Sequence, residues 1–311
     1  MKCTTTTLAL LVLAGSAGIA SAQNLFFGSA GGHSGRNSLY TTDLNGLGST
    51  DILPTPMVVS GVAVDGGAGR VFWQEPHHGS GRNQWSIHSA NLNGSAHSVV
   101  SSWTQSSGNT YGVAADRTNR QVYWADINGI SRANYNGSAT AAIVSFHHVN
   151  EVEVDPAANR LFWAGYDSGG NVGIWSSTLN GASPRLLRAI PGAAIISGLT
   201  VDPTSSTLFW VDYTSGTVSS MDYAGGSITT LLSSPFVSGA EFEPVTNRLY
   251  LASKSPPAGR IAWMPPTGGP VTTVYTGIGQ GEMWDVGAIV PAPGSLALLA
   301  AGAFVVRRRR L

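Results

Sequence analysis

The sequence predicts an all-β fold, in which short strands form a ring of similar four-stranded sheets. Two repeated signals carry this prediction: an apolar strand that ends in an acidic residue and is followed by an aromatic pair, and a tight turn of the type Leu-Asn-Gly. The composition agrees, because 39 glycines and 42% hydrophobic residues, with only 11% charged residues, suit many short strands joined by turns.

The first 22 residues are expected to be a signal peptide rather than part of the fold. Lys2 is followed by an apolar run from Leu8 to Ala14, and Ala20-Ser21-Ala22 supplies the small residues of a cleavage site before Gln23. The single cysteine of the chain, Cys3, lies within this segment. The mature protein is therefore expected to contain neither disulfides nor reactive thiols.

Five segments repeat the pattern of an acid-ended strand and an aromatic pair. The acidic residues are Asp65, Asp116, Asp155, Asp202 and Glu243. The aromatic pairs or their equivalents are Phe72-Trp73, Tyr123-Trp124, Phe162-Trp163, Phe209-Trp210 and Tyr250-Leu251. The acidic positions lie 51, 39, 47 and 41 residues apart. A period of about 45 residues is typical of the four-stranded blades of a β-propeller.

The second signal is a turn that follows each aromatic pair and closes a hairpin, because Asn and Gly tolerate positive φ. It is present as Leu44-Asn45-Gly46, Leu92-Asn93-Gly94, Tyr135-Asn136-Gly137 and Leu179-Asn180-Gly181, and in weaker form as Tyr223-Ala224-Gly225 and Pro266-Thr267-Gly268. Six turns against five strand pairs imply that one blade is divided between the two ends of the chain.

The divided blade is expected to close the ring. Leu25-Phe26-Phe27 matches an aromatic strand, and Gly281 to Asp285 matches a first strand that ends in an acid. Pairing of these two segments removes the free sheet edges that invite aggregation. We therefore predict a six-bladed β-propeller over residues 23–288, closed by N- and C-terminal strands in one blade.

Residues 289–311 are expected to form a sorting tail. Val290-Pro291-Ala292-Pro293-Gly294 precedes an apolar stretch from Leu296 to Val306 and then Arg307 to Arg310. The layout resembles the PEP-CTERM signals of Gram-negative bacteria, which combine a Pro-Glu-Pro motif, a short apolar helix and a basic cluster that stays on the cytoplasmic side of the membrane. This chain has Pro-Ala-Pro where that family usually has Pro-Glu-Pro. The resemblance implies processing by an exosortase-like enzyme, transient membrane association through residues 289–311, and a place in the cell envelope or extracellular matrix. The alternative is an ordinary membrane anchor, although the apolar stretch is shorter than the roughly 20 residues that span a bilayer.

The repeats resemble those of YWTD propellers of the low-density-lipoprotein-receptor type. The resemblance is carried by Val-Tyr-Trp-Ala-Asp at 122–126 and Leu-Phe-Trp-Val-Asp at 208–212, and it extends over residues 24 to about 288. The chain departs from the family at Gln74-Glu75, Ala164-Gly165 and Ala252-Ser253, where Thr-Asp or its equivalent would stand. It also lacks the cysteine-rich modules of the animal receptors. The resemblance implies the fold and not a receptor function.

The repeated aromatic and acidic residues are expected to serve the fold. The large aromatic residues, which would pack between neighbouring sheets, are Trp73, Trp124, Trp163 and Trp210. The acidic residues, which stand where a carboxylate accepts backbone N–H bonds in a turn, are Asp65, Asp116, Asp155 and Asp202.

Residues that break the repeat are candidates for a site. Residues 147–153 read His-His-Val-Asn-Glu-Val-Glu, and Glu241 is the equivalent of Glu153 in another blade. The candidate metal ligands near the central channel are Asn150, Glu151, Glu153 and Glu241. Calcium would accept the oxygen ligands and zinc the histidines. A second cluster, Glu75-Pro76-His77-His78, is expected in a loop after the second strand of its blade, upstream of Trp85.

Charge and motifs restrict the function. The 17 basic residues include Lys2 and Arg307 to Arg310, so 12 remain in the core against 17 acidic residues, which argues against a nucleic-acid binder. The sequence has no Gly-x-Ser-x-Gly elbow, no His-Glu-x-x-His and no phosphate-binding loop. The leading hypothesis is therefore a secreted binding or scaffold module, without catalytic residues or cofactor, for an extracellular protein or polysaccharide.

The competing hypothesis is a divalent-metal-dependent hydrolase or lactonase. Six-bladed propellers that resemble gluconolactonases hold a cation in the channel with Glu, Asn and Asp. That resemblance implies calcium or zinc on Asn150, Glu151, Glu153 and Glu241, where the cation would polarise a carbonyl and activate water.

Overall fold

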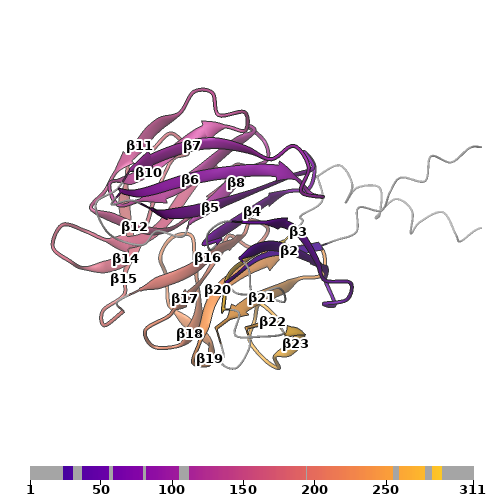
Figure 1. Ribbon diagram of the computed structural model, residues 1–311. Coiled ribbons are helices and arrows are strands. Elements are labelled where there is room, and N and C mark those ends of the chain that lie inside the picture. The colour runs from indigo at the N-terminus through magenta and orange to yellow at the C-terminus, as the bar shows by residue number, and fades with distance from the viewer. Residues whose placement is uncertain are drawn as a thin grey trace, which may run out of the picture.

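The computed structural model describes residues 24–30, 37–55, 59–79, 82–104, 112–193, 195–254, 259–276 and 282–288. Within these ranges the regular structure is β-strand, arranged as six four-stranded antiparallel sheets. The sheets stand side by side around a common centre (Figure 1). The predicted all-β, six-bladed propeller is confirmed.

We number the blades 1 to 6 and give the strands of each from the centre outward. Blade 1 contains β4 (Gly61–Asp65), β5 (Arg70–Gly79), β6 (Arg82–Asn91) and β7 (Ser98–Thr104). Blade 2 contains β8 (Val113–Asp116), β9 (Gln121–Asp126), β10 (Gly129–Asn134) and β11 (Ala141–Ser145). Blade 3 contains β12 (His148–Asp155), β13 (Arg160–Tyr166), β14 (Val172–Ser177) and β15 (Arg185–Ala189).

The remaining blades follow the same order. Blade 4 contains β16 (Ile196–Asp202), β17 (Thr207–Asp212), β18 (Thr217–Asp222) and β19 (Thr229–Ser233). Blade 5 contains β20 (Val237–Glu243), β21 (Arg248–Ser253), β22 (Arg260–Met264) and β23 (Thr272–Thr276). Blade 6 contains β24 (Glu282–Ala288), β1 (Asn24–Ala30), β2 (Ser38–Asp43) and β3 (Thr50–Pro54).

Blade 6 closes the ring with strands from both ends of the chain, as predicted. β24 pairs antiparallel with β1, with Leu25 opposite Ala288 and Phe27 opposite Val286, and it lies beside the inner strands β4 and β20. One detail of the prediction was wrong, because the strand does not end at Asp285 but continues to Ala288. The three extra residues pair with Leu25, Phe26 and Phe27 of β1.

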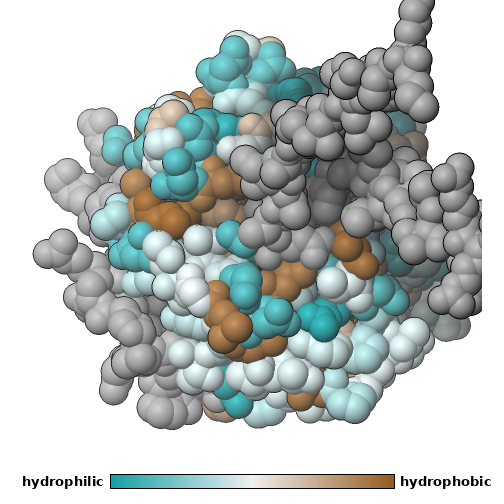
Figure 2. Space-filling view, turned by 90° about the vertical axis from the view of Figure 1, so that its right-hand side faces the viewer, coloured by the Kyte–Doolittle hydropathy of each residue, from teal (hydrophilic) through white to brown (hydrophobic). Residues whose placement is uncertain are grey.

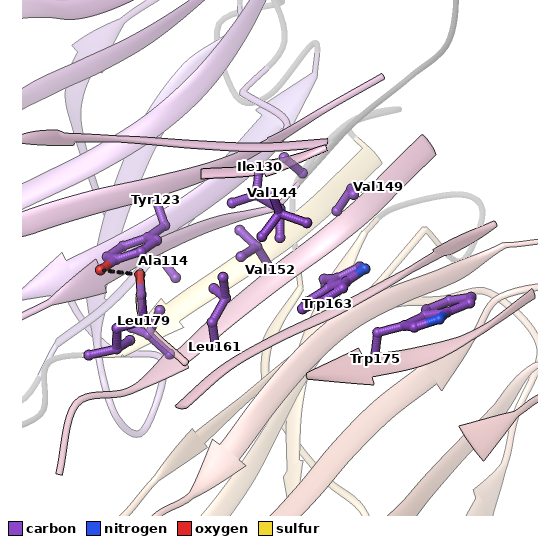
Figure 3. Close-up of a cluster of buried hydrophobic side chains, with 12 residues drawn as sticks. Ala114, Tyr123, Ile130, Val144, Val149, Val152, Leu161, Trp163, Trp175 and Leu179 are labelled. Carbon is purple, nitrogen blue, oxygen red and sulfur yellow. Dashed lines mark hydrogen bonds between the residues drawn. The ribbon is translucent and has the colours of Figure 1, made fainter. Parts of the chain in front are cut away.

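Each pair of neighbouring blades shares one hydrophobic core. Figure 3 shows the core between blades 2 and 3, where Trp163 and Trp175 lie near Val149 and the Tyr123 hydroxyl donates to Leu179 O at 3.3 Å. The repeated tryptophans are at most 2% exposed: Trp73, Trp124, Trp163 and Trp210. A ring of shared cores means that no blade buries its apolar faces alone.

The acidic residue that ends an inner strand organises the turn after it. One carboxylate oxygen accepts backbone N–H bonds, as Asp65 Oδ1 does from Ala68 N at 2.9 Å and Asp155 Oδ1 from Ala158 N at 3.1 Å. The other oxygen receives a side-chain donor from one of two sources. In blades 1 and 3 the donors lie in the next blade. Tyr135 donates to Asp65 and Tyr223 to Asp155, both at 3.0 Å, and the Arg120 guanidinium also donates to Asp65, at 2.9 Å. In blades 2, 4 and 5 it comes from the same turn, as Asn119 to Asp116, Ser205 to Asp202 and Thr246 to Glu243.

The glycine of the repeated turn serves the contact between blades as well as the turn. Gly94 has φ +82°, and a Cβ there would overlap the Ile52 carbonyl of blade 6. Gly181 has the same φ, and its Cβ would overlap the Ile143 carbonyl of blade 2. The turn therefore needs glycine twice over, for positive φ and for close approach of two backbones.

Candidate functional site

The two ends of the propeller differ because all the inner strands run in the same direction. We call the end where the inner strands reach their acidic residues the B end. The opposite end, the A end, carries the links from one blade to the next and the hairpins between the second and third strands of each blade. β1 begins and β24 ends at the B end, since Leu25 is paired with Ala288.

The inner strands β4, β8, β12, β16 and β20 surround a central cavity of about 540 Å³. Its wall is mostly valine, alanine, leucine and proline. The charged side chains on the wall are Arg117, Arg120, Glu151, Glu153, Asp155 and Glu241. The cavity therefore combines an apolar lining with charges of both signs, a composition that suits a ligand site.

Glu153 and Glu241 occupy matching places on the wall, as the repeat predicted, opposite Phe162 and Tyr250 on the second strands of their blades. Glu153 Oε1 accepts a hydrogen bond from the backbone N–H of Val154 at 2.7 Å. Glu241 Oε2 accepts one from the Thr200 hydroxyl at 3.2 Å. Both carboxylates are thus held by donors of the protein itself.

Glu151 and Asn150 lie further toward the A end. Glu151 is 7% exposed and is on the cavity wall, whereas Asn150, 2% exposed, lies at a β-bulge with its Nδ2 3.4 Å from His148 Nε2. The place of Glu151 is taken by Gly112 and Gly198 in neighbouring blades, where a Cβ would overlap the backbone of the next inner strand. A long acidic side chain here is therefore specific to blade 3.

Three of the four predicted metal ligands thus share one cavity: Glu151, Glu153 and Glu241. Within the described part of the chain, no group of three or more His, Cys, Asp or Glu side chains is arranged to hold a metal ion. Calcium or zinc binding at Asn150, Glu151, Glu153 and Glu241 stays a prediction.

The part of the chain that the structure describes contains no helix of the length and apolarity that crossing a bilayer requires.

The second predicted cluster was placed wrongly. Glu75-Pro76-His77-His78 lies not in a loop but within β5, whose ten residues pair with β6 so that Pro76 is opposite Trp85. The side chains of His77 and His78 are outside the described residues. Glu75 itself is 1% exposed and faces His88 of the neighbouring strand.

Glu75 also begins a chain of titratable groups whose other members, His88 and His97, sequence reasoning missed. Glu75 Oε2 lies 3.1 Å from His88 Nε2, close enough for an ion pair although not aligned as a hydrogen bond. His88 Nδ1 lies 2.9 Å from His97 Nε2, so one imidazole donates and the other accepts. The Trp73 ring is stacked near both imidazoles, with ring centres 5.4 and 5.3 Å apart. Partial burial lowers the pKa of His97.

A second missed feature lies at the A end of blades 4 and 5, and we call it the Tyr-Phe-Lys patch: Tyr213, Phe236 and Lys254. Tyr213 is 37% and Phe236 47% exposed, and Lys254 Nζ lies 5.1 Å from the centre of the Tyr213 ring. Phe236 has φ +75°, a conformation that costs a bulky residue about 1–3 kcal/mol and is most frequent at functional sites. The other non-glycine residues of positive φ in the described ranges have φ between 53° and 56°.

Other large apolar side chains on the surface do not gather in this way. Leu47, Val99, Leu186 and Val271 are exposed on four different blades. On the face drawn in Figure 2, hydrophobic residues form small separate areas among hydrophilic ones. Single exposed apolar residues are normal on a protein surface and need no function.

Comparison with known proteins identifies the fold but no family. No protein-family model and no curated protein sequence matches this chain. A chain in the crystal structure of a nidogen/laminin complex is 19% identical, with a TM-score of 0.68 over 86% of this chain and 98% of that one. TolB from Acinetobacter baumannii is 15% identical, with a TM-score of 0.69 over 86% of this chain and 67% of that one. Regucalcin from Agrobacterium tumefaciens, a calcium-binding protein, is 14% identical, with a TM-score of 0.53 over 70% of this chain and 75% of that one. At these identities the likeness shows the fold alone.

Proposed function

We propose that the protein is an exported binding or scaffold module that presents the loops of its A end to an extracellular protein or polysaccharide. The observation that carries the proposal is the position of the chain ends. β1 begins and β24 ends at the B end, so both terminal segments join the propeller there and leave the A end to a partner. A propeller of the same fold occurs in a complex between two proteins, nidogen and laminin, which supports a binding role.

The terminal segments support export. Residues 1–22 have the features of a signal peptide, and residues 289–311 resemble a PEP-CTERM sorting tail. Together the two segments favour the cell envelope or extracellular matrix of a Gram-negative-type bacterium, where an exosortase-like enzyme processes the tail.

Mass spectrometry of the protein from its native cells tests the export. We expect Gln23 at the N-terminus and no peptide that contains Arg307 to Arg310. A variant that lacks residues 289–311 is expected to leave the envelope fraction and collect in the soluble exported fraction. An intact arginine tail in the membrane fraction would contradict processing, and unprocessed protein in the cytoplasm would contradict the function itself.

A metal-dependent hydrolase is the second candidate, because Glu151, Glu153 and Glu241 share one cavity. If a cation binds there, a hundredfold excess over its Kd stabilises the fold by about 2.7 kcal/mol. We expect no such gain from calcium or zinc, since Glu153 and Glu241 already accept hydrogen bonds from Val154 and Thr200. A rise in Tm with either metal that is lost in Glu153→Ala would favour the hydrolase instead.

A further inference from the structure

We infer that the Tyr-Phe-Lys patch is a binding site for an acidic polysaccharide, a chain whose sugar rings carry carboxylates. The inference rests on the proposed function and names its ligand class. The patch lies at the A end, away from the end where the terminal segments join the propeller. It combines two exposed aromatic rings with an ammonium group, the two kinds of group that such a ligand needs.

The three parts of the patch are held together by backbone hydrogen bonds between loops that are distant in sequence. Lys254 N donates to Phe236 O at 2.9 Å, and Ser234 N donates to Gly216 O at 2.7 Å, which joins the hairpin of blade 4 to the link that follows it. Tyr213 N donates to Ile195 O at 3.0 Å and so ties the hairpin to the preceding link. The backbone segments that carry the two rings are therefore held in place before a ligand arrives, which lowers the ordering cost of binding.

The hairpin that carries Tyr213 is also fixed from within. Asp212 Oδ1 accepts the backbone N–H groups of Thr214 and Ser215 at 2.9 and 3.2 Å, and Asp212 Oδ2 accepts the Ser215 hydroxyl at 2.7 Å. These bonds occupy the carboxylate, which is 8% exposed. The Asp212 carboxylate, which directly precedes Tyr213, thus points into its own hairpin and is largely covered.

Positive side chains outnumber negative ones at this end of blades 4 and 5, by two to one among the described residues. Among their described residues, the charged side chains at the A end are Asp212, Lys254 and Arg260, and Arg260 is exposed and paired across the strands with Ser253, next to Lys254. The core of the chain is acidic as a whole, with 17 acidic against 12 basic residues between Lys2 and Arg307. A local pair of cations on an acidic protein selects for a ligand of negative charge.

The aromatic rings select for sugars among the negative ligands. The face of an aromatic ring is electron-rich and attracts polarised C–H groups, and the flat side of a pyranose ring presents a row of them. Phe236 and Tyr213 offer two such faces, and Lys254 with Arg260 offers partners for the carboxylates.

Binding to immobilised polysaccharides tests the inference on the protein purified as the cell exports it. Polygalacturonate is the acidic probe and dextran the neutral one. We expect binding to polygalacturonate that weakens with salt, and little binding to dextran. Phe236→Asn, Tyr213→Ala and Lys254→Gln are each expected to reduce the affinity about fivefold or more, a loss that only a minority of interface residues reach when truncated.

Two controls keep the result interpretable. Asn tolerates the positive φ of residue 236, so Phe236→Asn is expected to fold, and its melting temperature is measured beside its affinity. Leu47→Asn removes an apolar side chain that is more exposed than either ring of the patch, from the turn between β2 and β3 at the opposite end, and is expected to bind as the wild type does. Wild-type binding with unchanged affinity in the three patch variants would overturn the site and leave the proposed function standing. Absence of binding to polygalacturonate, or equal binding to dextran, would overturn the ligand class, while the export test above decides the proposed function separately.

Discussion

Replacing Tyr223 by Phe removes one hydroxyl group and tests how the blades are joined. That hydroxyl donates to Asp155 Oδ2 at 3.0 Å. Burial, together with the Asp155 carboxylate, raises the pKa of Tyr223 far above its ordinary value, so the hydroxyl keeps its proton. Asp155 is 2% exposed, and water is therefore a poor substitute for the lost donor. A hydrogen bond to a charged group contributes about 1.5–3 kcal/mol. At about 2 °C per kcal/mol for a domain of this size, Tm is expected to fall by about 3–6 °C.

Ala158→Asn is the matched rescue. In blade 2 the third residue after the acid is Asn119, whose Nδ2 donates to Asp116 Oδ2 at 2.7 Å, and Ala158 holds that position in blade 3. The substitution is expected to return most of the lost Tm in the Tyr223→Phe protein and to change the wild type little. Scanning calorimetry of the four proteins measures both effects. If Tyr223→Phe melts with the wild type, or if Ala158→Asn fails to raise its Tm, this account of blade pairing is refuted.

Three further outcomes are expected. Gly94→Ala should destabilise the fold far more than Gly48→Ala, although both glycines have positive φ. A Cβ at Gly94 would meet a carbonyl of blade 6, whereas a Cβ at Gly48 would meet nothing. Equal losses of stability in urea unfolding would contradict the close contact at Gly94. His97 should make stability depend on pH: its folded pKa lies below the ordinary value of about 6.5, so its contribution is present above that pH and is lost as the pH falls toward the folded pKa. In Tm measurements His97→Gln should flatten this acid decline, and an unchanged slope would assign it to other groups. Deleting residues 24–30 should expose an edge of β24 and lower Tm sharply, because a blade loses its second strand; a deleted protein that melts like the full one would disprove closure by β1.

The fold could be predicted from the sequence because the same signals recur along the chain. The acid, the aromatic pair and the Asn-Gly turn recur in phase along the chain, so the repeat can be read from the sequence before any contact between blades is known. Closure by Leu25-Phe26-Phe27 followed from counting, since one blade lacked its second strand. The end of the inner strand of blade 6 was misjudged, because the strand was expected to end at its acidic residue, Asp285. It continues past Asp285 to Ala288, which pairs with Leu25 of β1.

The candidate sites were less predictable, because they depend on contacts between distant loops. Glu153 and Glu241 were found from the repeat, which gives equivalent positions directly. The extension of β5 through Pro76 was missed, since proline within a run argues against a strand. The Tyr-Phe-Lys patch forms only when blades 4 and 5 stand side by side. No local sequence pattern predicts that its three residues lie close together.

The position of β24 has a mechanical consequence. Its last residue, Ala288, lies at the B end, where the C-terminal segment begins, and the strand runs from there toward the A end between β4 and β20. If a partner holds the A end while the C-terminal segment is pulled, the force acts along the length of β24. Its hydrogen bonds to β1 then share the load in shear, rather than opening one after another as a peeled strand would. The β1–β24 pair that closes the ring is thus aligned with the direction of a force applied through the C-terminal segment.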